Sequence, residues 1–207
     1  MKKAYIATYP LRQCGIGTFT QNLFNSMIAS KKDDSDYRNS FIIAMDDPNE
    51  KLIYPEEVKL TIRQELQEDY LAAAKHINVS GADCCILQHE FGIFGGQDGI
   101  YILPLLHELE IPLIVTLHTV MQAPSNNQKE VLQTICGMAN RVVVMSYKAI
   151  EMLVEIYEIP RSKIAYIEHG VPKIEYEQEK VKKEFKLENR KVLLTFGFVG
   201  RNKGIET

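Results

Sequence analysis

The sequence predicts an α/β fold in which helices cover a doubly wound, mostly parallel sheet. Short apolar runs alternate along the chain with segments whose apolar residues recur at helical spacing, which is typical of repeated β-α units. Residues 84–88 form a continuous apolar run, as expected for a strand that is buried on both faces. Glycine, histidine and other polar residues follow several of these runs, at the sheet edge where ligands bind in such folds.

The first predicted strand covers residues 4–8, and the first helix covers about residues 18–30 because Phe19, Leu23 and Met27 share one face. The remaining apolar runs predict strands at residues 41–45, 59–62, 84–88, 113–117, 141–145 and 164–167. Helical spacing predicts further helices at about residues 66–77, 99–109, 128–138 and 150–157. We expect the crossovers between parallel strands to be right-handed.

The composition is that of a soluble globular protein, with 207 residues, 45% of them hydrophobic and 25% charged. The net charge of −3 predicts no strong attraction to nucleic acid or to anionic membrane. No run approaches the roughly 18 apolar residues of a membrane span, and the apolar run at residues 4–8 is too short for the core of a signal peptide. We therefore expect a cytoplasmic protein, with a peripheral position at the inner membrane surface left open.

The four cysteines match no zinc motif, and we expect reduced thiols. They are Cys14, Cys84, Cys85 and Cys136.

A change in composition predicts a domain boundary near residue 172. Residues 173–191 are crowded with glutamate, lysine and arginine, which is typical of a solvated linker or a charged surface helix. Residues 192–196 then resemble a buried strand, and a glycine-rich turn follows them. We therefore expect one domain over residues 1–172, a charged linker, and the incomplete beginning of a second domain over residues 192–207.

The segment Cys14-Gly15-Ile16-Gly17-Thr18 is predicted to join the first strand to the first helix. Glycines there let the backbone approach a ligand, and the free N–H groups of a helix N-terminus favour an anion. Thr18 is the expected N-cap. A dinucleotide fingerprint would need a glycine or alanine where Thr20 stands, so a tight structural turn remains an equal alternative.

Three histidines, His89, His118 and His169, each end a different predicted strand, so they are expected to converge. One interpretation is a metal site with Glu90 as a fourth ligand or base. The other is a polar pocket for sugar and phosphate, in which imidazoles hydrogen-bond the ligand. Because no ligand pair has the short helical spacing of common zinc enzymes, we expect no metal.

A basic segment after residues 192–196 contains Arg201 and Lys203 beside glycines. The guanidinium group can bind two oxygens of a diphosphate, and the ammonium group adds positive charge. A basic surface turn is the equally weighted alternative.

Together these segments resemble the retaining glycosyltransferases of the GT-B fold, in the large group called family 4, over essentially the whole chain. The matching segments, in chain order, are Gly15-Ile16-Gly17-Thr18, His89-Glu90-Phe91-Gly92-Ile93-Phe94-Gly95-Gly96, His118 in Thr116-Leu117-His118-Thr119, His169-Gly170-Val171-Pro172, and residues 196–204. Glu168 departs from the family, in which proline is common at this position. The Glu-x7-Glu motif of the family and its second Rossmann-like domain are not present.

The resemblance implies the N-terminal, Rossmann-like half of an enzyme that moves a hexose from a nucleotide-sugar to an acceptor hydroxyl with retention. His118 would contact the transferred sugar, and Arg201 and Lys203 would hold the donor diphosphate with help from Gly15 and Gly17.

The same resemblance implies that His89, Glu90 and His169 border the acceptor side of the cleft. The co-substrate would be a UDP or GDP sugar, the acceptor a carbohydrate or glycolipid, and no cofactor would be bound. We expect the chain alone to be inactive without a C-terminal domain. A UDP-sugar epimerase and a non-enzymatic binding module are the alternatives.

Overall fold

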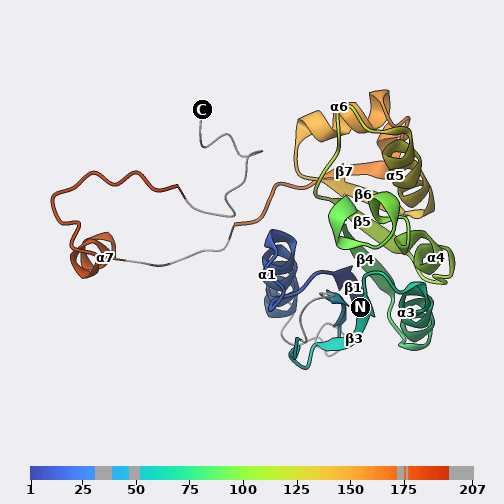
Figure 1. The fold of residues 1–207 in the computed structure, drawn as a ribbon, viewed down its shortest axis with the longest axis horizontal. Helices are drawn as coiled ribbons and strands as arrows, with labels where there is room; N and C mark the ends of the chain where they lie inside the picture. The colour runs from blue at the N-terminus through green and yellow to red at the C-terminus, as the bar shows by residue number, and fades with distance from the viewer. Residues whose placement is uncertain (31–38, 47–51, 172–174, 176, 196–207) are drawn as a thin grey trace. The chain divides into compact units, whose positions relative to one another are not determined.

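A computed structural model of the protein describes residues 1–30, 39–46, 52–171, 175 and 177–195. By the contacts between residues, the chain divides into two units, Met1–Gly170 and Val171–Thr207. The first unit contains the sheet and the helices that pack on it (Figure 1). The described part of the second unit contains helix α7 (Gln178–Glu184) and has no buried side chain.

The first unit contains a seven-stranded sheet in which every neighbouring pair is parallel, with the strand order β3-β2-β1-β4-β5-β6-β7. The strands are β1 (Lys3–Ala7), β2 (Phe41–Asp46), β3 (Val58–Arg63), β4 (Cys84–His89), β5 (Leu113–Leu117), β6 (Arg141–Val144) and β7 (Ile164–Tyr166). This arrangement confirms the predicted doubly wound α/β fold of Rossmann-like type, and the sheet is wholly parallel.

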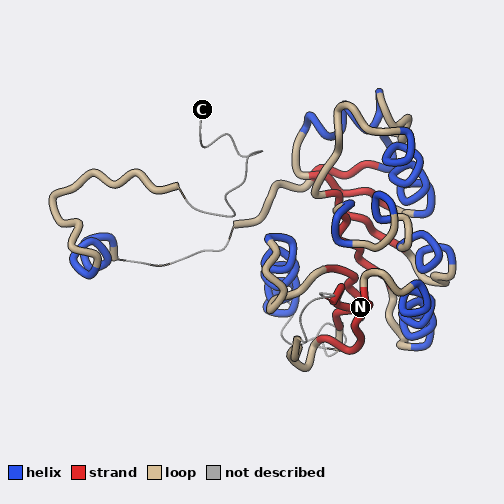
Figure 2. The backbone as a smooth tube through the Cα atoms, viewed as in Figure 1, coloured by secondary structure: helices blue, strands red, loops and turns tan. Residues whose placement is uncertain are grey.

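Helices cover both faces of this sheet, as Figures 1 and 2 show. The α-helices of the first unit are α1 (Gly15–Ser30), α3 (Gln67–Val79), α4 (Ile102–His107), α5 (Asn126–Met138) and α6 (Tyr147–Glu155). Three short 3₁₀ helices accompany them: η1 (Phe91–Ile93), η2 (Gln97–Gly99) and η3 (Arg161–Lys163). Helix α1 lies on one face, and α3, α4 and α5 lie on the opposite face.

The two faces of the sheet have separate hydrophobic cores. The larger core gathers buried side chains from α3, α4, α5 and α6 around residues such as Leu87, Val115 and Val142. The smaller core lies under α1 and contains Tyr5, Phe24 and neighbouring aliphatic side chains. Because successive side chains of a strand point to opposite faces, β1 and β4 supply residues to both cores.

Several helix boundaries differ from the prediction, among them those of α1 and α4. Helix α1 begins at Gly15, three residues before the expected start, and α4 covers only Ile102–His107 within the expected 99–109. In the second case the positive φ of Gly99 and two short 3₁₀ helices occupy the region before α4. Of the strand expected at residues 192–196, Val192 to Thr195 have no regular secondary structure, and residue 196 lies outside the described residues.

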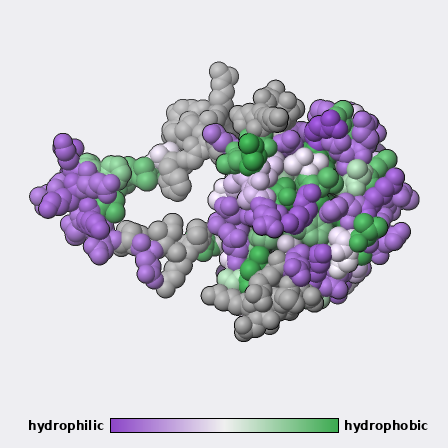
Figure 3. Space-filling view, turned by 90° about the horizontal axis from the view of Figure 1, so that it is seen from below, coloured by the Kyte–Doolittle hydropathy of each residue, from purple (hydrophilic) through white to green (hydrophobic). Residues whose placement is uncertain are grey.

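All four cysteines are free thiols; Cys84, Cys85 and Cys136 are buried, and Cys14 is partly exposed. None of the helices within the described residues has the length and apolar character that crossing a membrane requires. The face shown in Figure 3 is mainly hydrophilic, and its apolar residues occur in several separate areas.

Candidate functional site

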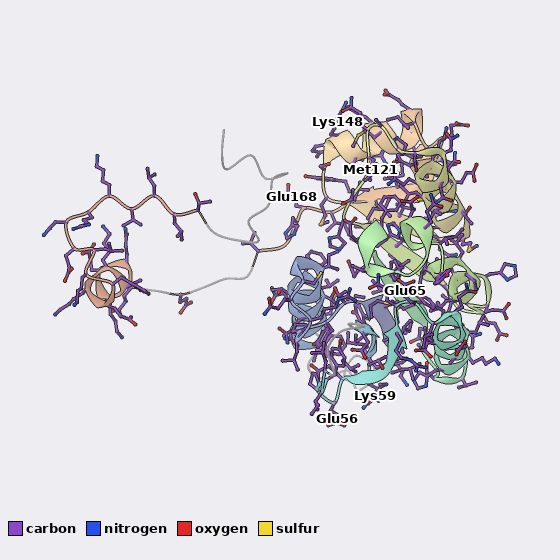
Figure 4. The ribbon with its side chains drawn as sticks, viewed as in Figure 1. Glu56, Lys59, Glu65, Met121, Lys148 and Glu168 are labelled. Atoms are coloured by element: carbon purple, nitrogen blue, oxygen red, sulfur yellow. The ribbon has the colours of Figure 1, made fainter. Side chains whose placement is uncertain are left out.

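The carboxyl ends of the parallel strands carry most of the residues singled out in the sequence. Strand β1 pairs with both β2 and β4, so the connections leaving β1 and β4 run in opposite directions. Open α/β sheets bind ligands in the crevice that forms at such a point. Figure 4 labels Glu65, Met121 and Glu168, which belong to the segments that follow β3, β5 and β7.

A pocket of about 460 Å³ lies at the ends of β5, β6 and β7. It is lined by Leu117, His118, Thr119, Val120, Met145, Ser146, Ala149, Met152 and His169. This lining contains no Asp, Glu, Lys or Arg, and its polar groups are two imidazoles and two hydroxyls. An uncharged ligand with hydroxyl groups and an apolar face therefore fits this pocket better than an isolated anion.

The first turn of α1 contains both glycines of the first motif. The N–H group of Thr18 already bonds to the carbonyl oxygen of Cys14 at 3.3 Å, so Thr18 lies inside the helix, and its predicted role as N-cap is wrong. A Cβ at Gly17 would lie 3.2 Å from the backbone carbon of Tyr9, so Gly17 allows the helix to pack closely on the preceding loop. Gly15 is exposed and has open space around it.

Phe19, on the next turn of α1, joins two of the three histidines. Its ring meets the His118 ring edge to face, with centroids 4.9 Å apart, and the His169 ring with centroids 5.1 Å apart. The structure thus brings together the start of α1, the end of β5 and the segment after β7. His169 is exposed, and its Nδ1 donates to the carbonyl oxygen of Gly170 at 2.8 Å.

His118 is held as a neutral imidazole. Burial lowers its pKa to about 4, and the nearby His169 adds to this effect. Its Nε2 lies 2.8 Å from Oε1 of Gln88, a fully buried residue of β4. Because Gln88 lies in β4 and His118 directly follows the neighbouring strand β5, the contact fixes the ring at the edge of the pocket.

His89 lies apart from this pair because it is fully buried. Gln88 and His89 are consecutive in β4, so their side chains point to opposite faces of the sheet. The His89 ring contacts the rings of Phe91 and Phe94, and neither of its nitrogens has a hydrogen-bond partner. Burial lowers its pKa to about 3. Of the three histidines expected to converge, the structure therefore places only His118 and His169 at the pocket.

Glu90 connects the segments that follow β4 and β5. Its carboxylate accepts hydrogen bonds from the N–H group of Phe91 at 3.0 Å and from the hydroxyl group of Thr119. Thr119 lines the pocket, but Glu90 does not. Glu90 therefore holds the wall of the pocket in place rather than facing its interior.

Gly95 and Gly96, in the segment after Glu90, serve close packing. A Cβ at Gly95 would lie 1.9 Å from the backbone oxygen of Gln64, which follows β3. Gly96 has a φ of 72° and packs against the ring of Tyr101. The side chain of Gln64 donates to the carbonyl oxygen of Gly92 at 3.3 Å and accepts from Arg12 at 2.9 Å. This segment thus joins the loops that follow β1, β3 and β4.

Two further sequence predictions concern a metal ion and the basic residues of the C-terminal segment. Within residues 1–30, 39–46, 52–171, 175 and 177–195, no group of three His, Cys, Asp or Glu side chains is placed to hold a metal ion. Arg201 and Lys203 lie outside the described residues.

Sequence reasoning gave no site role to Phe19 or Gln88. The parity of the strands was an available signal for Gln88, because Gln88 pairs with Thr116 in β5 and His118 lies two residues after Thr116, just beyond the end of β5. The contact of Phe19 with both histidines depends on how α1 crosses the sheet, which the sequence pattern does not contain.

Comparisons with known proteins support the fold. No protein-family model matches the chain, and no curated protein matches its sequence. Among solved structures, a glycosyltransferase from Rickettsia africae ESF-5 is similar, with a TM-score of 0.58 and 16% identity. The match covers 90% of this chain and 50% of that one, so the chain spans about half the length of this neighbour. The chain therefore has a glycosyltransferase-like fold.

Proposed function

We propose that this chain is the N-terminal, acceptor-side half of a retaining GT-B glycosyltransferase of family 4, acting on a nucleotide-sugar and an acceptor hydroxyl. The observation that carries the proposal is the pocket beside neutral His118, at the carboxyl edge of a sheet shared with a glycosyltransferase. A pocket that is lined by imidazole, hydroxyl and methionine side chains, and that contains no Asp, Glu, Lys or Arg, suits a sugar ring, which has polar edges and apolar faces.

In the proposed reaction, the bond between the anomeric carbon and the donor phosphate oxygen breaks, and a bond to the acceptor oxygen forms on the same face. The acceptor proton passes to the departing diphosphate, so the protein needs no general base. His118 hydrogen-bonds the transferred sugar, and His169 borders the same pocket. Glu90 supports the acceptor side through Thr119, and His89 supports it from the core.

The donor diphosphate is assigned to groups that favour negative charge. The N–H groups in the first turn of α1, at Gly15 and Gly17, are free of helical partners and carry the positive end of the helix dipole. Arg201 and Lys203 would add the charge that stabilises the leaving group.

Ligand-detected NMR on the 207-residue chain tests this proposal. UDP-glucose, UDP-N-acetylglucosamine, GDP-mannose and simple methyl glycosides are offered separately, and transfer is assayed with this chain and with any longer polypeptide that contains it. We expect at least one sugar to bind and His118→Asn to weaken its binding about tenfold or more, by removing a buried polar contact.

His107→Asn is the matched control, because His107 is exposed on α4. Absence of sugar binding, or equal loss in both variants, would contradict the proposed site. Conversion of UDP-N-acetylglucosamine without any acceptor would instead identify an epimerase.

A further inference from the structure

Gln88 is a polar side chain inside a strand whose other residues are also buried. All six residues of β4 are buried, and Gln88 has no exposed surface. Its Oε1 lies 2.8 Å from His118 Nε2, while its own Nε2 has no hydrogen-bond partner. Burying an amide group whose nitrogen has no hydrogen-bond partner costs free energy. The hydrogen bond between Gln88 and His118 offsets part of this cost.

This contact determines which nitrogen of His118 carries the proton. In this orientation of the Gln88 amide its oxygen faces His118, and because that oxygen only accepts a hydrogen bond, His118 Nε2 is the donor. Because the pKa of His118 is lowered to about 4, the ring carries a single proton near pH 7, and that proton is on Nε2. The lone pair of Nδ1 then remains available as an acceptor.

The groups around His118 favour the same state. Phe19 from α1 contributes an uncharged ring, and the nearby His169 after β7 disfavours a positive charge on His118. His89 at the end of β4 is buried and uncharged near pH 7. The carboxylate of Glu90, on the segment after β4, accepts hydrogen bonds from Thr119 and from the N–H group of Phe91.

We propose that Gln88 is a positioning residue, which holds His118 as the Nε2–H tautomer so that Nδ1 accepts a hydrogen bond from a ligand in the pocket. The inference rests on the proposed function and specifies the direction of the hydrogen bond between His118 and the ligand. The ligand group beside His118 is a donor, such as a sugar hydroxyl. A phosphate oxygen, which only accepts, is disfavoured at this position.

The test measures the tautomer directly and needs no activity. The full 207-residue chain is labelled with ¹⁵N and ¹³C in its histidine side chains, and the five imidazoles are assigned by single substitutions. In the unaltered protein at pH 7 we expect His118 to be neutral with its proton on Nε2. A dominant Nδ1–H tautomer or an imidazolium would overturn the proposal.

Two variants extend the measurement. Gln88→Leu should remove the tautomer preference, so that a substantial Nδ1–H population appears. Gln88→Glu should raise the pKa of His118 by about one to three units, because an adjacent carboxylate favours the imidazolium. Gln67→Glu is the charge-matched control, because Gln67 is exposed at the start of α3.

An unchanged tautomer in folded Gln88→Leu protein would overturn the positioning role. If either variant fails to fold, the tautomer of the unaltered protein still decides the proposal. Sugar binding is measured separately with methyl glycosides: the expected tautomer without any sugar binding would contradict the proposed function and leave the role of Gln88 intact.

Discussion

At the scale of single residues, His89 is a buried imidazole whose two nitrogens both lack partners. Such groups carry the cost of lost hydration without a compensating hydrogen bond. Its ring instead contacts Phe91 and Phe94, which are apolar interactions that leucine can partly replace. His89 therefore contributes to the core through the contacts of its ring with aromatic side chains and not through hydrogen bonds.

We expect His89→Leu to leave the free energy of unfolding unchanged or to raise it by about 1 kcal/mol, because it removes two unpartnered polar atoms. Urea denaturation at pH 7 measures this change. His76→Leu is the control, because His76 is only partly buried at the edge of Phe41. A loss of more than about 2 kcal/mol specific to His89→Leu would show that His89 makes a polar interaction that the chain needs.

Stability should also fall in mild acid. The pKa values of His89 and His118 are about 3 and about 4 in the folded protein, below the ordinary value of 6.5. The unfolded chain therefore binds more protons as the pH drops below about 6.5, and the free energy of unfolding decreases progressively toward pH 4. Urea midpoints between pH 7.5 and 4 should show this decrease, and it should be smaller in His89→Leu; equal slopes would contradict the assignment.

The sequence predicted that polar residues follow the strand ends, but it did not predict which of these residues lie at the same pocket. Polar residues at strand ends were visible in the pattern, and His118 and His169 do border one pocket. The separation of His89 follows from strand parity and was available in principle. Phe19 contacts both histidines because α1 crosses the sheet at this point. The position of that crossing depends on packing between segments that are distant in sequence.

At the scale of elements, the segment after β4 depends on the glycine at position 95. The backbone of Gly95 lies against that of Gln64, and its N–H group donates to the hydroxyl of Tyr70 at 2.9 Å. A side chain there would force two loops apart. These loops also carry Glu90 and the contacts of Arg12.

Gly95→Ala should therefore lower the free energy of unfolding by at least about 2 kcal/mol, since neither backbone can move without breaking its hydrogen bonds. Gly92→Ala is the matched control, because a Cβ at Gly92 meets nothing within 4 Å. Denaturant melts of the two variants give the comparison. Equal stability of the two proteins would show that the loops separate at little cost.

The first residues of helices α5 and α1 show that local sequence patterns predict helix boundaries only approximately. Helix α5 begins at Asn126 after a capping box between Ser125 and Gln128. The residues of this capping box are visible in the sequence, whereas helical spacing alone predicted a start at about residue 128. Helix α1 begins with glycines, which are poor helix formers, because the close packing of Gly17 on Tyr9 outweighs local preference.

At the scale of the whole molecule, every buried apolar side chain among the described residues lies between Ala4 and Ile164. The described part of Val171–Thr207 buries none of its side chains. We expect a chain ending at Gly170 to unfold within about 2 °C of the 207-residue chain, because it keeps this core. Differential scanning calorimetry of both chains measures the shift. A fall of 5 °C or more would show that the later residues stabilise the sheet.

The position of β1 inside the sheet, between β2 and β4, has a consequence for the order of folding. Its β4 neighbour is distant in sequence: Lys3 pairs with Cys84, and the N–H group of Lys2 donates to Asp83 across 81 positions. During synthesis, the middle of the sheet therefore cannot close until about 90 residues have left the ribosome. Contacts between such distant segments slow folding. Until β4 arrives, one edge of β1 has no strand to pair with, and the nascent chain is exposed to association with other chains at that edge.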